Sequence, residues 1–183
     1  KQPALPFPSA ARALVQEAER LFGARRFAEA EKKFKEALRF DANNVFVLSN
    51  LAACQLEQDR LAEAGTTLQR ALAQKADDAH TRSLLGILKF RQGKFDEALA
   101  NLNRAAEIDP KDAQTQNYLG IALSQKGQSD AAEAAVLRAI ELNPRYGGAQ
   151  HNLAVIYATR KPPELEKARS SYQKALEAGH PRN

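Results

Sequence analysis

Hydrophobic residues along this chain fall in pairs of short segments, and within each segment their spacing fits one face of a helix. The pattern is clearest over residues 79–112, where it predicts one helix over about 79–92 and a second over about 95–108. Gly93 lies where a helix commonly ends on a left-handed residue, and Pro110 follows the second segment because proline cannot continue a helix. This stretch therefore predicts a hairpin of two helices.

Small residues repeat along the chain with a period of 34 residues. Alanine or glycine occupies three equivalent positions of successive hairpins, and leucine occupies a fourth. The four series are Ala30, Ala64, Ala98 and Ala132; Ala37, Ala71, Ala105 and Ala139; Ala18, Ala52, Gly86, Gly120 and Ala154; and Leu51, Leu85, Leu119 and Leu153. A side chain no larger than a methyl group lets two helices cross closely. Because one hairpin cannot bury its apolar face alone, we expect the hairpins to stack into a solenoid.

Composition and charge agree with a folded helical chain and argue against nucleic-acid binding. Hydrophobic residues make up 44% of the 183 positions and charged residues 27%, which is typical of a globular protein. The net charge of +5 is spread along the chain, and basic residues such as Lys32 and Lys33 alternate with Glu29 and Glu36 at helical spacing. This arrangement predicts a solvated helix face, and no nucleic-acid partner is expected.

The sequence offers little for catalysis, metal binding or membrane insertion. Cys54 is the single cysteine, and the three histidines, His80, His151 and His180, are far apart and belong to no metal-binding motif. We therefore expect no enzymatic activity, no catalytic residue, no metal and no cofactor, and we expect Cys54 to be a buried small hydrophobe. No apolar run approaches the roughly 20 residues that span a bilayer, so a soluble protein is predicted, with the cytoplasm slightly favoured.

These features together resemble the tetratricopeptide repeat (TPR) family. The family pattern has Leu and Gly or Ala at positions 7 and 8, Ala at positions 20 and 27, and Pro at position 32. The resemblance covers residues 11–183, although Glu17 replaces the leucine in the first repeat and the proline is present as Pro110 and Pro144. It implies an all-α fold, a right-handed superhelical α-solenoid of antiparallel helix hairpins. The implied repeats are 11–44, 45–78, 79–112, 113–146 and 147–183, preceded by a proline-rich linker or chain end over 1–10.

The last repeat departs from this pattern in two ways. A two-residue insertion at Lys161, Pro162 and Pro163 is expected to lengthen the turn between its helices. No capping helix with a polar outer face follows it, so we expect the last hairpin to offer a surface for weak self-association. Since the chain also begins at Lys1 without a methionine, we expect it to be a piece of a longer protein.

In TPR proteins the first helix of each hairpin lines a concave face, and this resemblance implies a binding groove. An apolar floor edged with amides, hydroxyls and imidazoles suits a peptide or helix of a partner. The predicted groove residues are Phe46, Ser49, Asn50, Ala53, His80, Ser83, Leu84, Ile87, Phe90, Gln114, Asn117, Tyr118, Ile121, His151, Asn152 and Val155.

Three functions remain open at this stage. The first is an adaptor or scaffold that binds a protein or peptide in its concave groove. The second is a regulatory or substrate-recruiting arm of a larger enzyme, for example of glycosyltransferase type, and the third is an assembly factor that self-associates. The five-residue carboxylate clamp of TPR proteins that bind chaperone C-termini is matched only by Asn50, so that sub-function is not supported.

Overall fold

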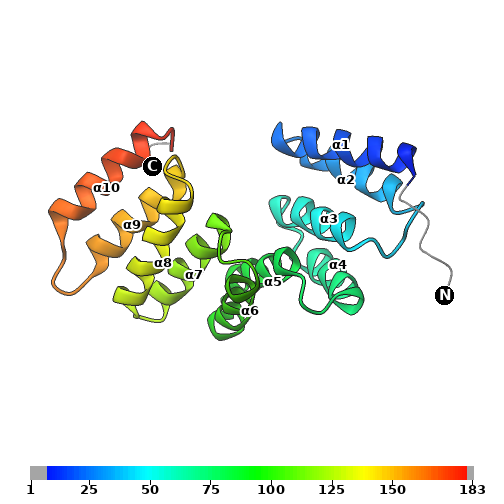
Figure 1. Ribbon diagram of the computed structural model, residues 1–183. Coiled ribbons are helices and arrows are strands. Elements are labelled where there is room, and N and C mark those ends of the chain that lie inside the picture. The colour runs from blue at the N-terminus through cyan, green and yellow to red at the C-terminus, as the bar shows by residue number, and fades with distance from the viewer. Residues whose placement is uncertain (1–7, 181–183) are drawn as a thin grey trace. The chain divides into compact units, whose positions relative to one another are not determined.

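The structure is a computed structural model that describes residues 8–180, and these residues form helices joined by short turns (Figure 1). The helices are α1 (Ser9–Gly23), α2 (Phe27–Ala37), α3 (Val45–Glu57), α4 (Leu61–Gln74), α5 (Ala79–Arg91), α6 (Phe95–Ile108), α7 (Ala113–Gln125), α8 (Ser129–Leu142), α9 (Gly147–Thr159) and α10 (Leu165–Glu177). The predicted all-α fold is confirmed, and no strand occurs within 8–180. The hairpin predicted over residues 79–112 is α5 and α6. No helix in the described part of the chain combines the length and apolar character needed to cross a membrane.

The start of the chain differs slightly from the predicted boundary. The expected linker over 1–10 lies mostly outside the described residues, but α1 already begins at Ser9. Pro8 occupies the N-cap position of α1, so the Ser9 side chain makes no capping hydrogen bond.

The turns inside the hairpins depend on one left-handed residue. Gly93 and Gly127 both have φ of 73°, as the sequence predicts for a glycine that ends a helix. The equivalent positions of the first two hairpins hold Arg25 with φ of 59° and Asp59 with φ of 56°. A non-glycine residue is strained in this region, so the first two turns keep the same geometry at some cost in stability.

The chain divides into two compact units, and the division falls inside α5, between Leu88 and Lys89. In the first unit, α1 packs on α2, α2 on α3, and α3 on α4. Its core includes Phe34 and Ala30 from α2 together with Leu51 and Cys54 from α3, all less than 5% exposed. The burial expected for Cys54 is confirmed, and burial raises the pKa of its thiol to about 12.

The second unit repeats the same packing from α6 to α10, again with each helix against its neighbour in the chain. Gly120 on α7 shows why the small-residue positions are needed. A methyl group added at its Cα would lie 2.4 Å from the Val136 side chain and 2.9 Å from the Ala132 carbonyl oxygen on α8. Contacts this short cannot be relieved by a side chain alone, so α7 and α8 can cross here only over a glycine.

The two helices of a hairpin are buried to different extents. Nine of the 13 residues of α3 are buried, whereas only four of the 14 residues of α4 are. The last hairpin shows the same difference, with seven buried residues in α9 and three in α10, whereas in the first hairpin α1 and α2 have four buried residues each. This difference decides which of the predicted groove residues remain accessible.

The last hairpin has the longer turn that the sequence predicts, because α9 ends at Thr159 and α10 begins at Leu165. The exposed side of α10 is polar, with residues such as Glu166, Arg169 and Gln173, and Leu165 is its one exposed large hydrophobic residue. The open side of α10 thus already has the polar character of a capping helix.

Candidate functional site

An open pocket of about 320 Å³ lies between the first helices of the first two hairpins. Arg12, Val15 and Gln16 on α1 form one side of it, and Asn44, Phe46 and Val47 at the start of α3 form the other.

Phe46 is the most accessible apolar group of this pocket. Its side chain is 52% exposed although α3 is otherwise mostly buried. The Asn44 side chain caps the helix by accepting a hydrogen bond of 3.1 Å from the backbone N–H of Val47, which holds the start of α3 in place. The pocket therefore combines a fixed aromatic ring with the guanidinium of Arg12 and the amide of Gln16.

Most of the other predicted groove residues of the first unit are less accessible. Asn50 donates its amide hydrogen to the carbonyl of Phe46 at 2.8 Å, so part of its hydrogen-bonding capacity serves its own helix. The Ser49 hydroxyl is buried, donates to the carbonyl of Val45 at 2.8 Å and lies 2.6 Å from the hydroxyl of Thr81. Four further predicted residues are buried: Ala53, Ser83, Leu84 and Ile87. His80 is exposed.

In the second unit, the structure brings together two of the predicted amides and one tyrosine. Asn152 on α9 donates to the Asn117 carbonyl oxygen on α7 at 2.9 Å, and Asn117 donates to the Tyr146 hydroxyl at 3.4 Å. Asn117 is only 3% exposed, and burial raises the pKa of Tyr146 to about 12. This cluster ties α7 to α9, and Asn152 is its accessible member.

The predicted histidine of α9 also has a partner that the sequence pattern did not indicate. The ring of His151 stacks on that of His180 with 4.6 Å between centroids, and Tyr172 lies 6.2 Å away. Burial and the neighbouring charge of His151 lower the pKa of His180. The pair joins α9 to the residues after α10.

Aromatic packing accounts for two more predicted residues of the second unit. Phe90 lies 5.6 Å from the Phe95 ring and 6.2 Å from the Tyr118 ring, and all three are half-buried. The remaining predicted positions are Gln114, which is exposed, Ile121, which is half-buried, and Val155, which is 44% exposed.

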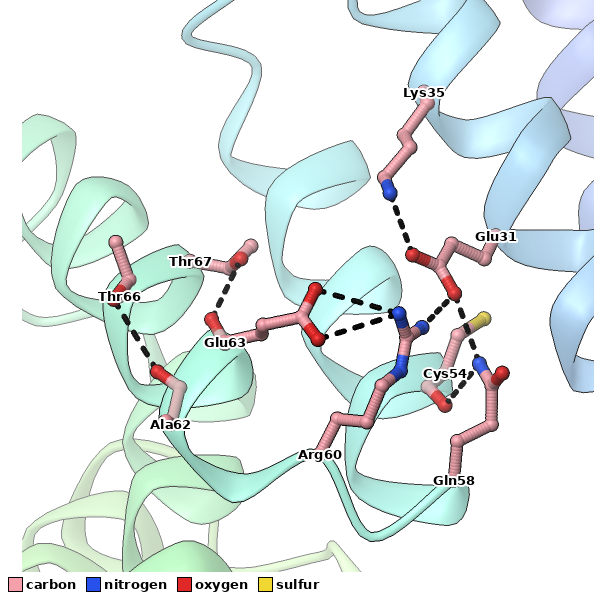
Figure 2. A network of polar contacts seen from close by, with 9 residues as sticks. All are labelled: Glu31, Lys35, Cys54, Gln58, Arg60, Ala62, Glu63, Thr66 and Thr67. Carbon is pink, nitrogen blue, oxygen red and sulfur yellow. Dashed lines mark hydrogen bonds and ion pairs between the residues drawn. The ribbon is translucent and has the colours of Figure 1, made fainter.

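A separate network of polar side chains surrounds Glu31 on α2 (Figure 2). The Glu31 side chain is 7% exposed and forms ion pairs with Lys35, at 2.7 Å, and with Arg60. It also accepts a hydrogen bond of 2.9 Å from Gln58, while Arg60 contacts Glu63 at 3.3 Å. Because each oxygen of Glu31 already faces a cation, this carboxylate joins one hairpin to the next and is no free general base.

No group of three or more histidine, cysteine or acidic side chains within 8–180 could hold a metal ion.

Sequence reasoning missed part of the pocket beside Phe46. Asn44 and Val47 fall outside the groove positions of the family pattern. Arg12, Val15 and Gln16 occupy groove positions 2, 5 and 6 of the first repeat.

Three family models match the chain and together span residues 21–182. They are described as Tetratricopeptide repeat over 21–88, TPR repeat over 88–127 and Tetratricopeptide repeat over 119–182. None of them describes an enzyme. We found no curated protein whose sequence matches this chain.

Several solved structures share the fold at low sequence identity. TTC0263, a thermophilic TPR protein of Thermus thermophilus, is 23% identical with a TM-score of 0.80, and the match covers 92% of this chain and 91% of that one. PilF of Pseudomonas aeruginosa is 20% identical with a TM-score of 0.78, covering 95% and 78%. YrrB, described as a TPR protein with an unusual peptide-binding site, is 22% identical with a TM-score of 0.62, covering 90% and 84%.

Proposed function

The chain belongs to the tetratricopeptide repeat family, and we propose that it is a protein-interaction scaffold that holds a peptide segment of a partner on the first helices of its hairpins. The observation that carries this proposal is the pocket between α1 and α3, in which the half-exposed Phe46 ring stands beside Arg12, Gln16 and Asn44. An aromatic anchor surrounded by polar groups is the usual composition of an energetically important contact.

The chemistry of the pocket indicates what kind of segment it would hold. Phe46 and Val15 offer apolar contact to one side chain of the partner. Arg12 can donate hydrogen bonds to a peptide carbonyl or a carboxylate, and Gln16 can both donate and accept. A similar role on α9 is proposed for Asn152 and the exposed Val155. YrrB supports the proposal in so far as a protein of this fold is described with a peptide-binding site.

The two other functions have less support. A regulatory arm of an enzyme would use the same binding surface, and the family models that match this chain are all models of repeats. Self-association through the last hairpin would require an apolar surface, whereas the exposed side of α10 is polar apart from Leu165.

The chain offers a matched pair of variants for testing the proposal. Phe46 and Phe40 are both in the first unit and are 52% and 50% exposed, but only Phe46 lines the pocket. Peptides would be selected from a random displayed library against the wild-type chain, and their affinities measured by calorimetry. We expect Phe46→Ala to weaken binding roughly tenfold or more and Phe40→Ala to change it less than about twofold. Equal affinity of the selected peptides for wild type and Phe46→Ala would overturn the proposal.

A further inference from the structure

A second pocket, of about 280 Å³, lies in the second unit and is formed by α8, α9 and α10. Its apolar lining consists of Leu137 and Ile140 from α8 and of Leu153 and Tyr157 from α9. Its polar lining consists of Gln150 from α9 and of Lys167, Ser170, Ser171 and Lys174 from α10. Such a volume accommodates one large apolar side chain, and Leu137 is 40% exposed beside it.

Within the second unit, this pocket is on a different side of α9 from Asn152 and Val155. Leu153 and Tyr157 are one helical turn apart on the side of α9 that packs toward α8 and α10. Val155 is on another side of the same helix, because it is two residues from both Leu153 and Tyr157, a rotation of about 200°. Asn152 is one residue before Leu153, a rotation of about 100°. The two faces can therefore be tested separately.

The charged groups of the pocket are all positive. No acidic residue lines it, and the hydroxyls of Ser170 and Ser171 lie between the two lysines along α10. The ammonium of Lys174 forms no ion pair within residues 8–180. The ammonium of Lys167 is 2.5 Å from a Glu164 oxygen and 5.2 Å from the centre of the Tyr157 ring, so it is held at the edge of the pocket.

The charge of Lys167 is specific to the last repeat. The equivalent positions of the first three repeats are Glu29, Glu63 and Glu97, each paired with a basic residue three positions earlier. In the last repeat the pair is reversed, with Glu164 first and Lys167 second. A lysine in the first turn of a helix is unfavourable beside the helix dipole, so helix stability does not explain this exchange. What the exchange produces is a cation at the pocket.

We propose that the α8–α9–α10 pocket binds an extended acidic peptide segment in which one large apolar side chain lies between two carboxylates three residues apart. The apolar side chain enters between Leu137, Ile140, Leu153 and Tyr157, and the carboxylates contact Lys167 and Lys174. The spacing follows from geometry. Seven residues of helix separate the two lysines by about 10.5 Å, and three residues of an extended chain of polyproline II type span about 9 Å and return to the same side.

The probe for this proposal is a labelled peptide, Ser-Asp-Phe-Ser-Asp-Ser, whose binding is followed by fluorescence anisotropy at low ionic strength. We expect the double variant Lys167→Glu with Lys174→Glu to weaken binding at least about tenfold, since it places two negative charges opposite the carboxylates. Lys111→Glu with Arg145→Glu changes the net charge of the same unit equally at exposed positions away from the pocket, and its affinity should stay within about twofold of wild type.

Two further variants test the details of the site. Leu137→Gln should weaken binding about threefold to tenfold by removing apolar contact. Glu164→Gln should strengthen it a few-fold, because it removes the carboxylate that competes for Lys167. Phe46→Ala should leave the affinity for this peptide unchanged, which separates this pocket from the one in the first unit.

Three results would overturn the proposal. One is equal weakening by the two charge-reversed double variants, which would mean general attraction to a basic protein. Another is unchanged binding of a peptide with alanine in place of phenylalanine, and the third is loss of binding in Phe46→Ala. Circular dichroism melts of every variant show that the fold is kept, so an altered affinity reports on the pocket.

Discussion

Each unit of this protein carries an acid–arginine network at the junction of two hairpins, and the two networks are built differently. In the first unit, Glu31 is 7% exposed and pairs with Arg60, which immediately precedes α4. In the second unit, Glu133 is 21% exposed, pairs with Arg160 at 2.7 Å and accepts a hydrogen bond of 2.7 Å from the Tyr157 hydroxyl. Arg160 immediately follows α9, so the two arginines come from different ends of the turn inside the hairpin.

The difference shows that this position of the repeat contacts the next hairpin, but that side chains of different chemistry can make the contact. Glu31 and Glu133 occupy the same place in their repeats, where the second and third repeats have Gly65 and Leu99. The fold therefore tolerates an apolar contact there. Where a carboxylate is buried, however, a cation must reach it, and each unit supplies one from a different part of the chain.

Removing the acid from each network gives the largest expected effect. Glu31→Gln should lower the free energy of unfolding by about 2–3 kcal/mol, because it removes a carboxylate that is only 7% exposed and is shared by Arg60 and Lys35, although Arg60 keeps its contact with Glu63. Glu133→Gln should lower it by about 1–2 kcal/mol, since the Glu133 side chain is 21% exposed and Arg160 keeps its 2.6 Å contact with Glu164.

Urea unfolding combined with hydrogen exchange would assign each loss to its unit, because units of a repeat protein can open separately. A larger loss for Glu133→Gln than for Glu31→Gln would contradict the idea that burial sets the difference between the two networks.

The tyrosine of the second network offers a smaller test. Tyr157→Phe removes the hydroxyl that donates to Glu133 and should lower the free energy of unfolding by about 1–2 kcal/mol. Burial raises the pKa of Tyr157 to about 12, so the hydroxyl keeps its proton and the effect should be constant between pH 6 and about 9. Denaturant melts across that range measure it, and a loss that varied with pH would point to another group.

The turns of the two units differ as well, and glycine exchanges make the difference measurable. Asp59→Gly should stabilise the first unit by about 0.5–1 kcal/mol because Asp59 has φ of 56°, which glycine adopts without strain. The reverse exchange in the second unit, Gly93→Ala, should destabilise it by about 1 kcal/mol. Thermal melts of the two variants should therefore shift in opposite directions, and shifts of the same sign would refute the strain argument.

The smallest expected effect is a pH dependence confined to the second unit. Burial, followed by the charge of His151, lowers the pKa of His180, so folding disfavours its protonated form. Stability from this group should be complete above its ordinary pKa of 6.5 and decline as the pH falls through the lowered pKa of the folded state.

Melting temperatures of wild type and His180→Gln at pH 7.5 and 5.5 test this sign. The decrease on acidification should be smaller in the variant, and an equal or larger decrease would show that the imidazole pair does not carry the pH dependence.

Much of the fold could be predicted from residue spacing. The series of small residues with a period of 34 residues indicated the hairpins. The helix α6 occupies the predicted range because Gly93 and Pro110 allow only one helix between them. Such local signals depend on backbone preferences and on which residues fit a helix crossing, and Gly120 under Val136 is the clearest case.

Accessibility, in contrast, follows from neighbours that are distant in sequence. The family pattern placed Ser49, Asn117 and Phe46 on one binding face, yet only Phe46 is exposed, because Ser49 meets Thr81 and Asn117 meets Tyr146 and Asn152. The position of a residue in a helix determines the direction in which its side chain points. It does not determine which other residues lie in that direction. For the same reason, the charge of Lys167 is plain in the sequence, but its place beside an apolar pocket exists only once α8, α9 and α10 pack together.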